Sequence, residues 1–93
     1  MKTVEVIGTV QSVGELVERG DFKKRDLIVK TEGEYPQVFA LEFVKEKEAE
    51  LDFIEKGERV KVACNLRGRD WTNPEGVTKY FITLQAWKIE KGN

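Results

Sequence analysis

Hydrophobic and polar side chains alternate along most of the chain, and this period of two predicts β-strands. Gly8 interrupts the first alternating stretch, which indicates a bulge or a sharp bend there. Glycine and proline residues separate the later stretches from one another. The five predicted strands cover residues 3–13, 22–32, 37–44, 58–71 and 78–90.

One phase of each predicted strand carries the side chains that we expect in the core. Cys64 shares its phase with apolar neighbours, and we interpret it as a core residue. Trp87 is ambiguous, because it shares its phase with Ile89 rather than with Leu84 and Ala86. We expect Trp87 to cover the outside of the fold, with stacking on a ligand as the alternative. The other inward positions are Val4, Val6, Val10, Leu27, Val29, Thr31, Phe39, Leu41, Phe43, Val60, Val62 and Leu66.

Residues 45–56 lose this period, because apolar side chains there recur at intervals of three and four. The spacing predicts a short amphipathic helix, built on Ala49, Leu51, Phe53 and Ile54, that stops at Gly57. A helix so short and acidic is not stable alone, so we expect it to dock on the strands.

The predicted order is three strands, a helix and two strands, which is the order of the OB fold. We therefore predict an all-β protein with one short helix: a five-stranded OB-fold barrel whose helix lies between strands three and four. Residues 1–93 are expected to form a single OB-fold domain. The competing layout is a small open α+β sheet with the helix on one face.

Two connections have features of their own. Residues 73–76 read Asn-Pro-Glu-Gly, which fits a type I turn between the last two strands. The loop over residues 14–21 contains two apolar residues, Leu16 and Val17. We expect them either to bury in a partner chain or to fold back as a hairpin extension of the first two strands.

The composition fits a small soluble protein. The chain has 93 residues, of which 40% are apolar and 35% charged. No stretch approaches the roughly 18 to 20 consecutive apolar residues that span a bilayer. The N-terminal residues alternate and include Glu5, unlike a secretory signal, so we expect a cytoplasmic protein without membrane contact.

The residues that carry most enzyme chemistry are scarce. The chain has no histidine, one cysteine (Cys64) and one serine (Ser12). Histidine is the usual general base at neutral pH and the commonest zinc ligand, so a nucleophilic triad or a Cys/His metal site is out of reach. We expect a protein that is not an enzyme and has no metal or cofactor.

Charge is segregated along the chain, although the net charge is only -1. Residues 19–30 contain five basic side chains, residues 42–58 seven acidic ones, and residues 59–69 are basic again. This distribution indicates one basic and one acidic face. The acidic helix is interpreted as a solvated outer face, with protein docking or repulsion of nucleic acid as sharper alternatives.

Cationic and aromatic residues cluster where an OB barrel binds its ligands, across strands two and three and between two loops. Binding of single-stranded nucleic acid needs cations for the phosphates and aromatic rings for the bases. Ordinary surface lysines on a solvated strand are the alternative, as is a Trp71–Tyr80 pair that only stabilises the hairpin. The candidate nucleic-acid-binding residues are Phe22, Lys23, Lys24, Lys30, Asn65, Arg67, Arg69, Trp71 and Tyr80.

The chain resembles a family of small bacterial and phage domains that is grouped with OB-fold single-stranded-DNA-binding proteins. It departs from the family pattern in the lengthened loop at residues 73–76 and in Arg67, where an acidic residue is expected. The resemblance covers nearly the whole chain and rests on Glu5-Val6-Ile7-Gly8-Thr9-Val10, Phe22-Lys23-Lys24, Tyr35-Pro36, Phe39-Ala40-Leu41-Glu42-Phe43, Asn65, Arg69-Asp70-Trp71 and Ala86-Trp87-Lys88-Ile89-Glu90.

These observations predict a non-enzymatic protein that binds single-stranded DNA with little sequence preference, in replication, repair or recombination. RNA stays open as a ligand, because stacking on aromatic rings accepts either sugar. Expected partners also include a second copy of the chain or a replication or recombination protein. The alternative is an OB-fold module for protein interaction or oligomerisation that does not bind nucleic acid.

Overall fold

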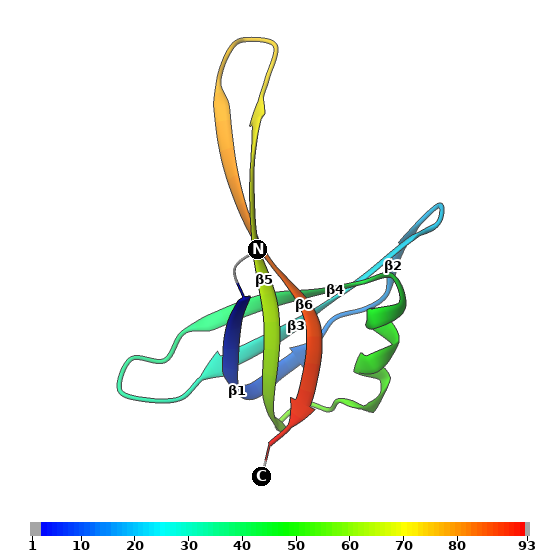
Figure 1. Cartoon of the computed structure of the whole chain (residues 1–93), viewed down its shortest axis with the longest axis vertical. Helices are drawn as coiled ribbons and strands as arrows, with labels where there is room; N and C mark the ends of the chain where they lie inside the picture. The colour runs from blue at the N-terminus through cyan, green and yellow to red at the C-terminus, as the bar shows by residue number, and fades with distance from the viewer. Residues whose placement is uncertain (1–2, 93) are drawn as a thin grey trace.

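The computed structural model describes residues 3–92 and is built mainly from β-strands (Figure 1). All five predicted strands are present, and a short extra strand, β2, pairs with the start of β3. The loop at residues 14–21 therefore folds back as a hairpin extension. The elements are β1 (Thr3–Val13), β2 (Val17–Arg19), β3 (Phe22–Thr31), β4 (Val38–Val44), η1 (Lys45–Phe53), β5 (Arg59–Thr72) and β6 (Thr78–Lys91).

The sheet closes on itself through β1, and the resulting barrel has the OB fold. The strand order is β1-β5-β6-β4-β3-β2, with an additional pairing of β1 with β3. Gly8 lies opposite Thr31 of β3 and Val60 of β5, where β1 passes from one partner to the other. A Cβ atom at Gly8 would lie 2.2 Å from the carbonyl oxygen of Lys30, so only glycine fits this approach. The bend predicted at Gly8 is confirmed, and a bulge follows between Val10 and Ser12.

The core fills the barrel with the inward side chains of the strands, closed at one end by η1 and the segment that follows it. Leu51 of η1 and Ile54 after it are buried against the strands. Cys64 is buried as predicted, and this burial raises the pKa of its thiol to about 11. The buried strand residues are Val6, Val10, Leu27, Val29, Leu41, Phe43, Val60, Val62, Cys64 and Ala86.

The helix differs from the prediction in type and in packing. It is a 3-10 helix, in which positions three apart share a face, so Leu51 lies in register with Ile54. Ala49 and Phe53 are four apart and both exposed, Phe53 to 74%. The expected amphipathic face of four residues was therefore wrong, and two residues make the contact. No helix among residues 3–92 is long and apolar enough to cross a membrane.

The β5–β6 hairpin extends well beyond the barrel, at the top of Figure 1. In the described part of the chain, β1 accompanies β5 as far as Asn65, and β4 accompanies β6 at Leu84 and Gln85. Leu66 lies one residue past Asn65 and is exposed, so its predicted place in the core was wrong. At the tip, the amide of Gly76 donates to the carbonyl of Asn73 at 3.0 Å, which confirms the predicted turn.

A bulge in β6 explains the ambiguous phase of Trp87. Ala86 lies opposite Cys64 and Lys88 lies opposite Ala63, so Trp87 is the extra residue between them. An extra residue reverses the alternation beyond it. Ile89 consequently packs against the core, while Trp87 is exposed on the outside of the barrel.

Candidate nucleic-acid interface

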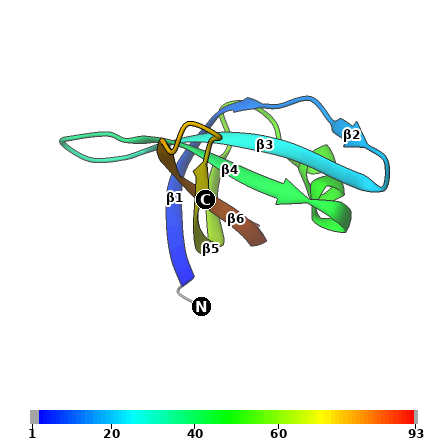
Figure 2. The same ribbon diagram turned by 90° about the horizontal axis from the view of Figure 1, so that it is seen from above.

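A groove of about 960 Å³ lies between the β2–β3 hairpin and the base of the β5–β6 hairpin. Figure 2 shows the β2–β3 hairpin and the helix on one side of the barrel and the β3–β4 loop on the other. We call this space the hairpin groove. Its lining residues are Gly14, Glu15, Val17, Arg19, Phe22, Lys24, Arg25, Asp26, Glu42, Arg67, Gly68, Arg69, Thr83 and Gln85.

The strand register brings the outward side chains of four strands into one row. Asp26 of β3 lies opposite Glu42 of β4, which lies opposite Gln85 of β6. On β5, Asn65 lies opposite Gln85, and Arg67, opposite Thr83, is the next outward position toward the hairpin tip. Arg67 reaches back to this row by donating a hydrogen bond to Gln85. Polar outward positions that are far apart in the sequence therefore form a single surface.

The groove is more positive than the chain as a whole. Five basic and three acidic side chains line it, a local net charge of +2, whereas the whole chain has a net charge of -1. A concave site with an excess of one charge concentrates ligands of the opposite charge. The basic members are Arg19, Lys24, Arg25, Arg67 and Arg69.

Arg67 and Arg69 are not paired with any carboxylate of the described residues. The Nη1 atom of Arg67 donates to Oε1 of Gln85 at 3.0 Å, and the Arg69 guanidinium lies 5.7 Å from the ring centroid of Phe81. Within the described residues 3–92, neither arginine has an acidic partner at ion-pair distance. Both guanidinium groups are therefore available to the oxygens of a phosphate.

Lys24 has a different environment, because two carboxylates surround it. Its Nζ atom lies 3.2 Å from Oε2 of Glu42 and 3.8 Å from Oδ1 of Asp26. The hydrogen bond to Glu42 outweighs partial burial and raises the pKa of Lys24. Lys24 stays charged, but its neighbours cancel much of its field, so it attracts a phosphate less strongly than the two arginines.

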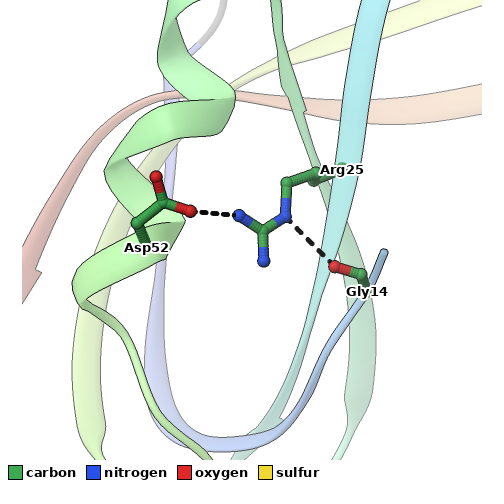
Figure 3. Close-up of polar contacts among 3 residues, drawn as sticks. All are labelled: Gly14, Arg25 and Asp52. Carbon is green, nitrogen blue, oxygen red and sulfur yellow. Dashed lines mark hydrogen bonds and ion pairs between the residues drawn. The ribbon is translucent and has the colours of Figure 1, made fainter. Parts of the chain in front are cut away.

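Arg25 connects three segments of the chain at one side of the groove (Figure 3). Its Nε atom donates to the carbonyl of Gly14 at 3.1 Å, and its Nη1 atom lies 2.8 Å from Oδ1 of Asp52. These bonds connect the end of β1 and the start of β3 with η1. The sequence identified the basic charge of Arg25 but gave no sign of this role, because both partners are distant along the chain.

Four of the nine candidate residues from the sequence lie together in the groove: Phe22, Lys24, Arg67 and Arg69. Phe22 is 42% exposed at the tip of the β2–β3 hairpin, where it lies opposite Arg19. Trp71 follows Arg69 on the same face of the hairpin, beyond the groove lining, and is 53% exposed. Trp71 therefore adds an aromatic ring to the face of the β5–β6 hairpin that carries Arg67 and Arg69, closer to the hairpin tip.

The other four candidates lie elsewhere. Lys23 has the opposite phase to Lys24 and faces Glu18 in the β2–β3 ladder, while Lys30 lies at the far end of β3. Asn65 lines a neighbouring hollow. Tyr80 lies opposite Asp70, so it points to the face of the hairpin away from Arg69 and Trp71. The expected cluster of Tyr80 with these residues was therefore wrong, because the alternation separates them.

Ten of the fourteen groove residues were not among the candidates, and three of these have side chains suited to a nucleic acid. Thr83 and Gln85 lie on the outward phase of β6. From the sequence, their side chains are as compatible with exposure to water as with a hydrogen bond to a nucleotide. Arg19 reaches the groove because β2 folds back on β3. The basic run that begins at Arg19 was the one signal for it in the sequence.

The fold and the groove between its two hairpins define an OB-fold protein. Over residues 3–90 the chain matches the family described as "Domain of unknown function (DUF3127)", and it belongs to this family. The predicted resemblance to a small OB-fold family is thereby confirmed. No curated protein matches the chain in sequence.

Solved structures with the same fold include two single-stranded DNA-binding proteins. The mitochondrial protein Rim1 of S. cerevisiae is similar with a TM-score of 0.73 and 13% identity, over 97% of this chain and 93% of that one. The second protein, SSBb of Mycobacterium smegmatis, is similar with a TM-score of 0.75 and 12% identity, over 99% of this chain and 87% of that one. At this level of identity the likeness establishes the fold.

Proposed function

We propose that the hairpin groove binds single-stranded nucleic acid, DNA above all, and that the protein is a binding protein and not an enzyme. The observation that carries this proposal is the position of Arg67 and Arg69, two arginines without carboxylate partners among the described residues, in the groove that Phe22 also lines. The two structural neighbours bind single-stranded DNA according to their descriptions, and their shared fold supports the same ligand class here.

The groove chemistry suits a ligand with alternating charged and flat parts. The guanidinium groups of Arg67 and Arg69 bind phosphate oxygens, and the ring of Phe22 stacks on a base. Each stack contributes about 1 to 3 kcal/mol and accepts every base. Little sequence preference follows, and RNA is expected to compete for the same groove.

Single-stranded DNA is exposed in replication, repair and recombination, and we place the protein in one of these processes. A protein that covers exposed strands needs to bind them irrespective of sequence, which stacking and phosphate contacts provide. A replication or recombination protein is the expected further partner.

The test is a titration of fluorescently labelled oligo-dT, at low and at moderate salt, with the natural protein and two variants. If about three cations contact phosphates, the logarithm of affinity falls against the logarithm of salt concentration with a slope near -2, at roughly -0.7 per contact. The Arg67→Ala/Arg69→Ala variant should bind more weakly, and its salt dependence should be shallower, with a slope closer to zero by about 1.4.

Lys61→Ala is the matched control. Lys61 is exposed on β5, at the same phase as Arg67 and six residues away, roughly 20 Å along the strand. Its removal should leave affinity and slope nearly unchanged. Absence of binding at low salt, or an equal loss in Lys61→Ala and in the arginine variant, contradicts the proposal.

Self-association is a second candidate function, which an apolar hollow favours. Ile7, Val38, Leu66 and Ile82 are exposed around this hollow, between β1, β4 and the β5–β6 hairpin. β1 pairs with β5 alone from Thr3 to Ile7, so its other edge is open in the described part of the chain. Two copies can pair through these edges about a two-fold axis.

Sedimentation of the natural protein and of Ile82→Lys tests this association. We expect a dimer for the natural chain and a monomer for the variant. A natural chain that stays monomeric at the highest soluble concentration contradicts this second candidate and leaves the nucleic-acid proposal untouched.

A further inference from the structure

Next to the hairpin groove lies a smaller hollow of about 340 Å³, which we call the Trp87 hollow. It lies where the end of β4 and the start of η1 meet β5 and β6, so it is separate from both hairpin tips. The lining residues are Val44, Lys45, Glu46, Lys47, Asn65, Gln85, Ala86 and Trp87.

The β6 bulge presents Trp87 to this hollow. In a regular strand the alternation that buries Ile89 would bury Trp87 as well, because the two residues share a phase. The extra residue releases Trp87, whose side chain is 43% exposed. Bulges of this kind frequently redirect a side chain beside a functional site.

Two lysines border the aromatic residue. Lys45 has a φ of 54°, the one non-glycine residue among residues 3–92 in the left-handed region, a strained conformation typical of functional sites. In the described part of the chain Lys45 has no ion-pair partner, whereas Lys47 lies 3.6 Å from Glu50. Glu46 opposes them, so the hollow has a net charge of +1.

The Trp87 hollow adjoins the hairpin groove. Gln85 lines both spaces, and Arg67 donates a hydrogen bond to Gln85 from the groove side. A strand that leaves Arg67 along the outward face of β6 therefore reaches Trp87 next, where a second ring and a cation repeat the chemistry of Phe22 and the arginines.

We propose that Trp87 is a second base-stacking site, with Lys45 as the cation for the adjacent phosphate, which lengthens the path of single-stranded DNA from the hairpin groove around the barrel. This inference rests on the proposed function. It implies that a short oligonucleotide occupies the groove alone, and that only a longer one also covers Trp87.

The natural fluorescence of the chain tests this inference. Trp71 and Trp87 are the two tryptophans, so Trp71→Phe leaves Trp87 as the only indole. Oligo-dT of increasing length, from about 4 to about 16 nucleotides, is added to this variant, a range that covers the site sizes of OB folds. Anisotropy of a labelled oligonucleotide reports binding, and tryptophan emission reports contact with Trp87.

We expect the emission of Trp87 to be quenched by the long oligonucleotides and to change little with the shortest one. Trp87→Ala should weaken binding of the long ligand by about fivefold or more, the lower end of one stack, and leave the short one nearly unchanged. Lys45→Ala should weaken binding of the long ligand in the same length-dependent way. Lys88→Ala is the matched control, since Lys88 is an exposed, neighbouring lysine paired with Glu90, and should have no effect at either length.

The possible failures are distinguishable. No anisotropy change of any oligonucleotide with the natural protein, titrated in parallel with Trp71→Phe, overturns the proposed function itself. Binding without quenching of Trp87 at any length overturns the second site and leaves the groove proposal standing. If Trp87→Ala does not fold, as circular dichroism would report, the quenching experiment in Trp71→Phe and the Lys45→Ala comparison still decide the question.

Discussion

The ammonium group of Lys24 and the carboxylate of Glu42 lie 3.2 Å apart across the β3–β4 ladder, inside a groove whose other charges are mainly positive. Asp26 adds a second carboxylate at 3.8 Å from the same ammonium group. These acidic side chains compete with a phosphate for Lys24. Arg67 and Arg69 face no such competition from the described residues, so the phosphate path is expected to follow these two arginines.

Replacement of Glu42 by glutamine should therefore strengthen binding of single-stranded DNA. The change removes a negative charge from the groove and frees Lys24, which corresponds to a gain of about two- to fivefold for a partly exposed ion pair. The salt dependence should become steeper by about 0.7, one additional phosphate contact. Glu5→Gln is the control, because Glu5 pairs with Lys61 away from the groove. An unchanged or lower affinity of Glu42→Gln would mean that the strand does not pass Lys24.

The ring of Phe22 is expected to contribute by stacking and not by charge. Phe22→Ala should weaken binding by about 1 to 3 kcal/mol and leave the salt slope unchanged. Phe53→Ala is a matched control, because Phe53 is also an exposed phenylalanine but lies on η1 outside the groove lining. Titration of both variants at two salt concentrations measures the difference. Equal affinities of the two variants would place the bases elsewhere.

Gly8→Ala should disrupt closure of the barrel. The added methyl group would meet the backbone of Lys30 at 2.2 Å, and a backbone atom between two paired strands cannot move aside. We expect a loss of about 3 kcal/mol or more in the free energy of unfolding, at or beyond the upper range for overpacked sites. Urea unfolding measures it, with Gly68→Ala as the control because the nearest atom there is 3.8 Å away. Equal stability of both variants would contradict the observed approach of β1 and β3.

The thiol of Cys64 should be inert in the folded protein. Burial raises its pKa to about 11, so the reactive thiolate is scarce at pH 8, and no reagent reaches the core. The neutral thiol stabilises the fold below pH 9, and this contribution should decline as the pH rises from 9 toward 11. A colorimetric thiol reagent should react slowly at pH 8 without denaturant and quickly in urea. Fast reaction of the folded protein would contradict the position of Cys64.

The strands could be predicted from the sequence because the barrel buries one face of each, which imposes the period of two on residues such as Leu27, Val29, Leu41 and Phe43. The same rule fails where the barrel ends. Leu66 keeps the inward phase but lies one residue past Asn65, the partner of Thr3, so the described part of β1 does not cover it and it is 43% exposed. Alternation reports the face of a strand and not the length over which that face is covered.

Part of the candidate site could also be predicted from the alternation of side chains along the strands. Lys24, Arg67 and Arg69 could be assigned to one surface because each has the outward phase. The phase of Trp87 was ambiguous, because a bulge reverses the alternation between Ala86 and Ile89, and the alternation alone does not give the position of a bulge. The role of Arg25 depends on its contacts with Gly14 and Asp52, which are distant along the chain. Arg19 reaches the groove because β2 folds back on β3. Local sequence patterns contain neither kind of information.

The most direct test of the account is a map of backbone amide shifts by nuclear magnetic resonance as a short oligo-dT is added. The account predicts that the largest changes follow the groove, at Phe22, Lys24, Arg67, Arg69 and Gln85. Amides around Glu5 and Lys61, on the outer face of the β1–β5 pair, should change little. Changes that gather on that outer face or on η1, or no saturable changes at low salt, would contradict the assignment of the hairpin groove as the nucleic-acid site.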